Sequence, residues 1–137
     1  MSNFSDYLEI QLLGHTLLGS IFTAPAAIFV GLITTLTTVT TEPTFTEVVS
    51  GVGYGRRPIS FNAPTSGPAW TVVQTGQIAF SQATDAWGDV AHFGLFDNGT
   101  IGGGNLLYWG DIPGGSQSVV AWDLIQIPNG EISVRLD

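Results

Sequence analysis

The chain has 137 residues, with 11 acidic and 3 basic side chains, a formal net charge of −8 and no cysteine. The absence of lysine and the excess of acids exclude a nucleic-acid-binding protein, because phosphate backbones are bound by clustered cations. Without cysteine there is no disulfide framework and no thiolate nucleophile or metal ligand, and this length predicts a single domain over residues 1–137.

The chain has few charged side chains to expose to water. Charged residues make up 10% of the sequence, well below the usual value of about a quarter, while the hydrophobic fraction is 44%. Such a chain either exposes many Thr, Ser, Gly and Asn side chains, or buries part of its outside against copies of itself or partner proteins. We favour the second interpretation, which predicts an oligomer.

Residues 1–18 are predicted to form an N-terminal α-helix. Ser2, Asn3 or Ser5 can cap it, and acidic residues early in the segment suit the positive end of the helix dipole. Gly14 or Gly19 is expected to end it. Apolar residues recur at helical spacing in two neighbouring stripes, Phe4, Leu8 and Leu12 in the first and Tyr7, Ile10, Leu13 and Leu17 in the second.

The segment from Ile10 to Thr41 contains no Asp, Glu, Lys or Arg and at first reads as a membrane span. Pro25 interrupts it, Gly and Thr recur, and no basic residue precedes it as in a signal peptide. We therefore expect a helix end, a loop and a buried strand in this segment, and no contact with a membrane.

From residue 26 to residue 136 the sequence predicts a β domain, because short runs of β-branched and aromatic residues are separated by Gly, Pro, Asn and Asp. The run 26–35 is almost continuously apolar, which predicts a central strand buried on both faces. The Thr-rich segment 34–47 is expected to be an exposed loop or an edge strand. Residues 89–96 and 105–110 form the clearest predicted hairpin, since a glycine-rich turn joins them.

Further apolar runs lie at 57–61, 69–75, 77–83, 118–127 and 131–136. The predicted fold is therefore mainly β, a compact antiparallel β-sandwich or barrel of about seven or eight strands with one N-terminal α-helix. That helix is expected to pack on a sheet or to seal one end. No internal repeat or fibrous period is visible, which predicts a compact chain.

Residues 83–100 bring three aspartates close to His92 in sequence and raise the question of an acid–base site. A histidine base needs a carboxylate and a nucleophile or water within hydrogen-bond reach. Because side chains alternate along a strand, His92 and Asp97 are predicted to point to opposite faces. Asp85 and Asp89 precede the strand in a turn, and Asp97 opens the next turn. We interpret this stretch as a strand and its turns.

Other signatures of catalysis and of ligand binding fail as well. "GTIGGGN" lies between two strands and has no following Lys, unlike a phosphate loop, and no Gly-x-Ser-x-Gly elbow occurs. The chain lacks the spacing of a calcium loop, although separate segments can still assemble a structural calcium site from Asp85, Asp89, Asp97 and Asp111. We predict no enzymatic activity, no catalytic residue and no cofactor.

Aromatic and arginine side chains indicate a binding surface. Tryptophan rings stack on sugars or anchor protein interfaces, although in small domains most rings belong to the core. We single out Trp70 and Trp109 as candidate exposed aromatics. Arg56 and Arg57 are either an interface anchor or an ordinary solvated pair. The candidate protein interface comprises Phe4, Tyr7, Leu8, Thr41, Phe45, Arg56 and Arg57.

Several segments together resemble the small phage structural proteins known as tail-fibre-like virion components. They are "NFSDYLEIQLLGH", "PAAIFVGLITT", "EVVSGVGYGRRPISF", "ATDAWGDVAHFGLFD" and "GGNLLYWG", which span nearly the whole chain. The resemblance implies a virion protein that assembles in the host cytoplasm by protein–protein contact, with no catalytic residues and no cofactor.

The favoured hypothesis is a homo-oligomeric capsid decoration or cement protein, because a compact chain without repeats cannot form a fibre shaft alone. Its expected partners are other copies of itself and the major capsid protein or tail proteins of the particle. One alternative is a tail-fibre- or baseplate-associated structural protein. An alternative of another class is a glycan-binding module for host recognition that uses exposed tryptophans.

Overall fold

The computed structural model describes residues 3–37, 43–67 and 69–136. Within these ranges the chain forms one helix and twelve short strands. In chain order these are β1 (Asn3–Phe4), α1 (Asp6–Leu17), β2 (Ile28–Thr37), β3 (Thr44–Glu47), β4 (Arg57–Phe61), β5 (Trp70–Thr75), β6 (Ile78–Ala79), β7 (Gly88–Val90), β8 (His92–Phe96), β9 (Leu106–Asp111), β10 (Gln117–Val119), β11 (Gln126–Ile127) and β12 (Ser133–Leu136).

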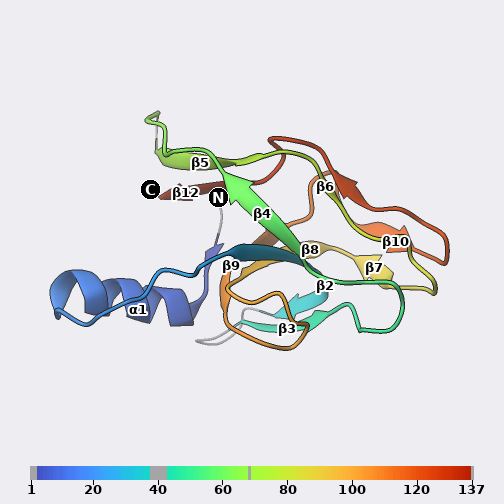
Figure 1. Ribbon diagram of the computed structural model, residues 1–137, viewed down its shortest axis with the longest axis horizontal. Helices are drawn as coiled ribbons and strands as arrows, with labels where there is room; N and C mark the ends of the chain where they lie inside the picture. Colours follow the sequence, from blue (N-terminus) through green and yellow to red (C-terminus); the bar gives the residue numbers. More distant parts are fainter. Residues whose placement is uncertain (1–2, 38–42, 68, 137) are drawn as a thin grey trace.

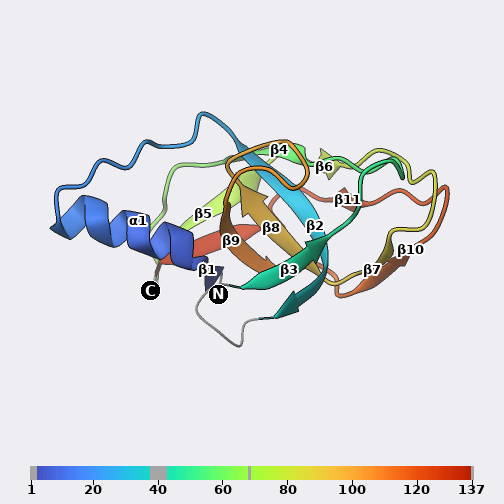
Figure 2. The same cartoon turned by 90° about the horizontal axis from the view of Figure 1, so that it is seen from below.

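The main sheet is antiparallel and follows the strand order β1-β9-β8-β2-β4-β5-β12, with β3 paired to β2 beside this path. Six of these strands, β1, β9, β8, β2, β3 and β4, curl into a half-barrel (Figure 1). The four strands outside the main sheet form two ribbons, β7 with β10 and β6 with β11, on the side away from α1 (Figure 2). The predicted mainly β fold with one N-terminal helix is confirmed, and the half-barrel takes the place of the sandwich or closed barrel.

Strand β2 lies at the centre of the sheet because its sequence tolerates burial on both faces. Val30, Leu32 and Ile33 have no solvent exposure, as the near-continuous apolar run predicts. β2 pairs with β8 on one side and with β4 and β3 on the other. The strand β3 has three exposed residues out of four, which confirms the predicted edge strand for residues 44–47 of the Thr-rich segment. Residues 34–37 instead continue β2, and 38–42 lie outside the described residues.

The limits of α1 follow from capping chemistry. The Ser5 hydroxyl accepts a hydrogen bond from the Leu8 N–H at 3.2 Å, so Ser5 is the N-cap among the three predicted candidates. The helix continues through Gly14, and Gly19 follows the C-cap with a φ of +71°. The helix thus covers residues 6–17 rather than 1–18, because residues 3–4 pair with β9 as the strand β1.

The expected packing of the helix on a sheet is confirmed for its first turns alone, which contact β9. Leu8 is the one buried residue of α1 in the structure, and beyond this first part the helix projects from the half-barrel at one end of the molecule's long axis (Figures 1 and 2). Two apolar stripes cannot both face the same sheet, so the second stripe is left toward solvent.

Among the described residues no helix has the length and apolarity needed to cross a bilayer.

The predicted hairpin of 89–96 and 105–110 is confirmed as the antiparallel pair β8–β9. Side chains from this hairpin, from β2 and from the two ribbons pack into one core. Its central members are Val30, Leu32, Phe80, Trp87, Val90, Phe93, Leu95, Val119 and Ile127.

Candidate interaction surface

The supposed acid–base stretch is a strand with its turns, as predicted. His92 and Asp111 are paired across β8 and β9, and the His92 Nδ1 lies 3.0 Å from a carboxylate oxygen of Asp111. The Asp111 side chain is 88% exposed, so this is a surface pair. Asp97 instead accepts hydrogen bonds from the backbone and side-chain amides of Asn105 at 2.7 and 2.9 Å. Its carboxylate therefore holds the β8–β9 turn and does not orient His92.

The acidic side chains do not converge on a metal position. Asp85 accepts a hydrogen bond from the next backbone amide at 2.8 Å, which is ordinary turn chemistry. Across the ranges that the structure describes, no three His, Asp or Glu side chains gather closely enough to hold a metal ion.

A buried ion pair lies under the β8–β9 turn, and the sequence pattern had not indicated it. The Arg56 guanidinium donates through Nε and Nη2 to the two carboxylate oxygens of Glu47 at 2.8 and 2.7 Å. The side chains are 1% and 6% exposed. The interpretation of Arg56 as half of a solvated pair is therefore wrong, because β3 brings Glu47 beside it. Arg57 is half-buried and donates to the Ser81 hydroxyl at 3.1 Å.

The same guanidinium fastens the turn that joins β8 to β9. Its Nη1 donates to the carbonyl oxygens of Asn98 and Gly103 at 2.7 and 2.9 Å, and its Cζ lies 3.6 Å from the ring centre of Phe96. Four hydrogen bonds and a ring contact thus satisfy this buried cation. The cluster is a structural device that fixes the turn relative to β3.

Tyr54 completes this cluster. Its hydroxyl donates to Glu47 at 2.6 Å and accepts from the Leu32 N–H at 2.9 Å. Burial, reinforced by the neighbouring Glu47 carboxylate, raises the pKa of Tyr54 well above its ordinary range. The phenol stays protonated and bridges the cluster to the central strand.

The most unusual surface of the molecule is the outer side of α1 and the turn that follows it, which we call the arm (residues 6–21). Five apolar side chains of the arm are 58–88% exposed, and we call them together its outer stripe: Ile10, Leu13, Leu17, Leu18 and Ile21. The first three fall at i, i+3 and i+7 and share one face of the helix. In the described part of the chain, nothing covers this stripe.

The predicted interface residues divide between the inside and the outside of the chain. Leu8 and Arg56 are buried within the chain, so their side chains are not accessible to a partner in this structure. Phe4 packs edge-on against Tyr108 with ring centres 4.9 Å apart. Tyr7 is half-buried and Phe45 is 37% exposed. Thr41 lies outside the described residues. The interface thus remains a prediction, and the exposed residues Ile10, Leu13 and Leu17 of the second stripe lie outside the predicted set.

The two candidate exposed tryptophans differ. Trp109 is half-buried within β9, whereas Trp70 at the start of β5 is 60% exposed. Trp70 lines a mainly apolar hollow together with Pro64, Thr71, Val72, Tyr108 and Val134.

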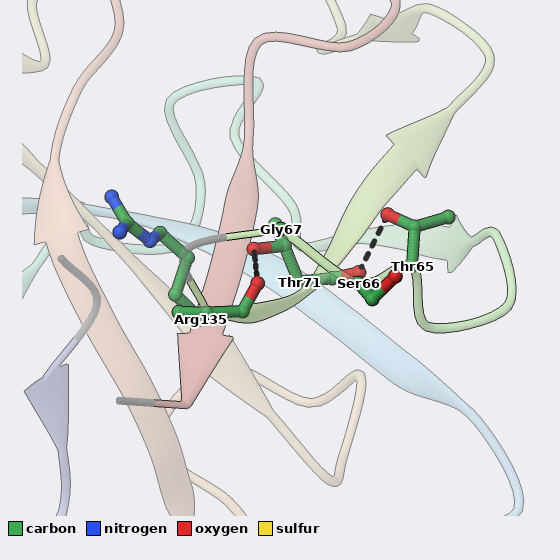
Figure 3. Close-up of a pocket in the computed structure, with 6 residues that line it drawn as sticks. Thr65, Ser66, Gly67, Thr71 and Arg135 are labelled. Atoms are coloured by element: carbon green, nitrogen blue, oxygen red, sulfur yellow. Dashed lines mark hydrogen bonds between the residues drawn. The ribbon is translucent and has the colours of Figure 1, made fainter.

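A second, more polar hollow adjoins the first at Thr71 and is lined by Thr65, Ser66, Gly67 and Arg135 (Figure 3). The guanidinium of Arg135 points away from Thr65 and Ser66 in this view. Because Thr71 lines both hollows, the hollow at the Trp70 ring adjoins the one that Thr65 and Ser66 line.

Comparison with protein families gives one match. A family model described as podophage GP4 fiber I protein gp80 matches residues 3–135 of the chain. A search of curated proteins finds no match. Because the family match covers nearly the whole chain, the recognition of a tail-fibre-like phage virion component is confirmed.

Proposed function

The chain belongs to the podophage GP4 fiber I protein family, and from this premise we propose that it is a non-enzymatic structural subunit of the virion fibre that assembles with other copies of itself through the arm. The family makes it a phage fibre structural protein located in the virion. Self-assembly through the arm is the step that we add.

The observation that carries this proposal is the exposed apolar stripe of the arm. A helix of 12 residues is marginal in water on its own, and α1 buries one residue against its own chain. Burial of an aliphatic side chain contributes about 1.5–3 kcal/mol, so five such side chains left in water forgo a large stabilisation. Burial of these side chains against a partner surface recovers this stabilisation. The need for such a partner explains why Ile10, Leu13 and Leu17 lie on one exposed face.

The family match favours the fibre over the capsid decoration role that the sequence first suggested. A compact subunit without an internal repeat builds a long object by repetition of subunit contacts. The arm provides a surface for such contacts. Decoration of the capsid instead requires a copy number comparable with that of the capsid protein.

Virions assembled with an arm variant test the proposal. Leu13→Gln with Leu17→Gln keeps helix propensity almost unchanged while it removes the apolar stripe. We expect purified virions to lose this subunit, whereas Val49→Gln, which replaces an equally exposed apolar residue elsewhere, is incorporated normally. Normal incorporation of the arm variant would contradict the proposal, and a copy number near that of the capsid protein would restore the decoration hypothesis.

A second candidate function, glycan binding, is supported by the hollow at Trp70. An exposed indole beside the hydroxyls of Thr65, Ser66 and Thr71 is suited to stack on a sugar ring and to bond its hydroxyl groups. We expect Trp70→Ala to abolish any saturable signal on a glycan array, with Trp109→Ala as the half-buried comparison. The absence of binding by the unmodified protein would eliminate this candidate.

A further inference from the structure

A second exposed apolar cluster lies in the turn between β10 and β11, which we call the Trp122 turn (residues 120–124). The Asp123 N–H donates to the Val120 carbonyl at 3.2 Å and closes the turn. Trp122 has a φ of +77°. Elsewhere in the described ranges every residue with positive φ is a glycine. A bulky side chain at this backbone position is strained, and glycine would relieve the strain.

The rest of the chain holds Trp122 in this conformation. Its N–H donates to the Ala83 carbonyl at 2.7 Å, and its carbonyl accepts from the Gln82 side-chain amide at 2.9 Å. The Asp123 carboxylate accepts from the Val120 N–H at 3.0 Å. The backbone is therefore fixed on both sides, while the indole is 71% exposed. Strain that persists at an exposed, tightly held position points to a function for the side chain that is presented.

The surroundings of the indole favour a protein surface over a sugar. The nearby polar side chains of Gln82 and Asp123 already bond the backbone of the turn. Two apolar residues of the same turn also face water, since Val120 is 55% exposed and Leu124 is 59% exposed. An exposed Trp within an apolar cluster is the typical composition of an energetically dominant protein contact.

The Trp122 turn and the arm lie at opposite ends of the molecule. Figures 1 and 2 both show α1 at one end of the long axis and the connection from β10 to β11 at the other. Two different surfaces at opposite ends of a subunit make a head-to-tail contact, and head-to-tail contacts that do not close into a ring generate an open filament.

We propose that the Trp122 turn of one subunit docks on the outer stripe of the arm of the next subunit, so that copies of this chain join head to tail. The inference rests on the proposed assembly through the arm and names the surface that covers it. It adds Trp122 as the anchor of the contact.

The exposed area is sufficient for a specific but weak contact. The five apolar side chains of the arm stripe and the three of the Trp122 turn expose roughly 600 Å² of apolar surface, on the usual areas for aliphatic and aromatic side chains. Because apolar atoms make up about 60% of an interface, the total is about 1,000 Å², the lower end for a specific contact. A fibre repeats this contact at every subunit.

Charge favours this pairing over the contact of two Trp122 turns. The part of the arm from Ile10 to Ile21 carries no Asp, Glu, Lys or Arg; His15 lies within it, and the two acids of the arm, Asp6 and Glu9, precede it. A head-to-tail contact places Asp123 over this acid-free part of the arm, whereas two facing Trp122 turns bring two Asp123 carboxylates together. A symmetric contact of two arms is the remaining competitor, and it leaves Trp122 free.

The experiment is sedimentation velocity over a range of concentrations with two complementary variants. Trp122→Gly removes the indole and relieves the backbone strain, and Leu13→Gln with Leu17→Gln removes the arm stripe. We expect the unmodified protein to form oligomers that grow with concentration, and each variant alone to be monomeric. An equimolar mixture is expected to give a 1:1 dimer and nothing larger, because each variant retains one intact surface.

Controls separate loss of the contact from loss of the fold. Val49→Gln replaces an exposed apolar side chain outside the contact and is expected to assemble like the unmodified protein. Trp122→Gly is expected to keep or raise the melting temperature, since its strain is gone. Trp122→Gly that assembles normally would overturn the inference, and so would an unmodified protein that stays monomeric. If the arm variant loses assembly and virion incorporation while Trp122→Gly assembles normally, the proposed function stands and the head-to-tail contact is contradicted.

Discussion

Arg56→Met should be one of the most destabilising substitutions in the chain. It leaves the Glu47 carboxylate buried with 6% side-chain exposure and without the two guanidinium hydrogen bonds that neutralise it. It also removes the donor to the carbonyls of Asn98 and Gly103. Breaking one partner of a buried pair costs about 3–5 kcal/mol, a large fraction of a total stability of about 5–15 kcal/mol.

Urea unfolding followed by tryptophan fluorescence measures this loss. Arg57→Met is the matched control, because Arg57 is half-buried and bonds the exposed Ser81, and it should change the free energy of unfolding by about 0.5 kcal/mol or less. Addition of Glu47→Gln to Arg56→Met should recover part of the loss, since no unpaired charge then remains buried. If Arg56→Met costs less than about 1 kcal/mol, as a solvated pair would, the reasoning is refuted.

Further predictions concern the same core and the helix start. Burial and the Glu47 carboxylate raise the pKa of Tyr54 in the folded state. Above a pH of about 10 the unfolded chain loses the Tyr54 proton that the folded chain retains, so the free energy of unfolding should fall as the pH rises. Urea titrations of Tyr54→Phe should show a smaller fall over this pH range. Gly31→Ala places a Cβ 2.8 Å from a Glu47 carboxylate oxygen and should cost about 1–3 kcal/mol in thermal unfolding, whereas Gly55→Ala, which meets no atom within 4 Å, should be nearly neutral. Ser5→Ala removes the N-cap of α1 and should cost about 1–2 kcal/mol, together with a loss of helical circular dichroism; an unchanged spectrum and stability would contradict the capping role.

Much of the fold follows from patterns that are local in the sequence. The strand 57–61 is predicted with its observed limits, because Gly55 and Asn62 flank a short run that contains Ile59 and Phe61. The β8–β9 hairpin follows from its glycine-rich turn, and the central position of β2 follows from its unbroken apolar run. These features depend on periodicity and turn chemistry alone.

Contacts that depend on strand register and on three-dimensional packing cannot be predicted from local sequence patterns. Glu47 and Arg56 meet because β3 and the segment before β4 lie on the same side of β2, which no spacing reveals. The pair of His92 and Asp111 likewise follows from the register of β8 and β9. The two stripes of α1 were visible, but the sequence could not tell that Leu8 faces inward and Leu13 outward.

The strain at Trp122 illustrates the same limit. The sequence "VVAWDLI" reads as an apolar strand, and it contains none of the glycines that usually mark a positive φ. The turn arises because hydrogen bonds from Gln82 and to Ala83, distant in the sequence, fix the backbone there. The role that we propose for this turn rests on its conformation and its exposure together.

The central claim is that the arm is an assembly surface, and the mass of the purified protein in solution tests it most directly. Light scattering should give a multiple of the subunit mass for the unmodified chain and the mass of a single subunit for Leu13→Gln with Leu17→Gln. An unmodified protein that is monomeric at every accessible concentration, or an arm variant with the same mass as the unmodified oligomer, would contradict the claim.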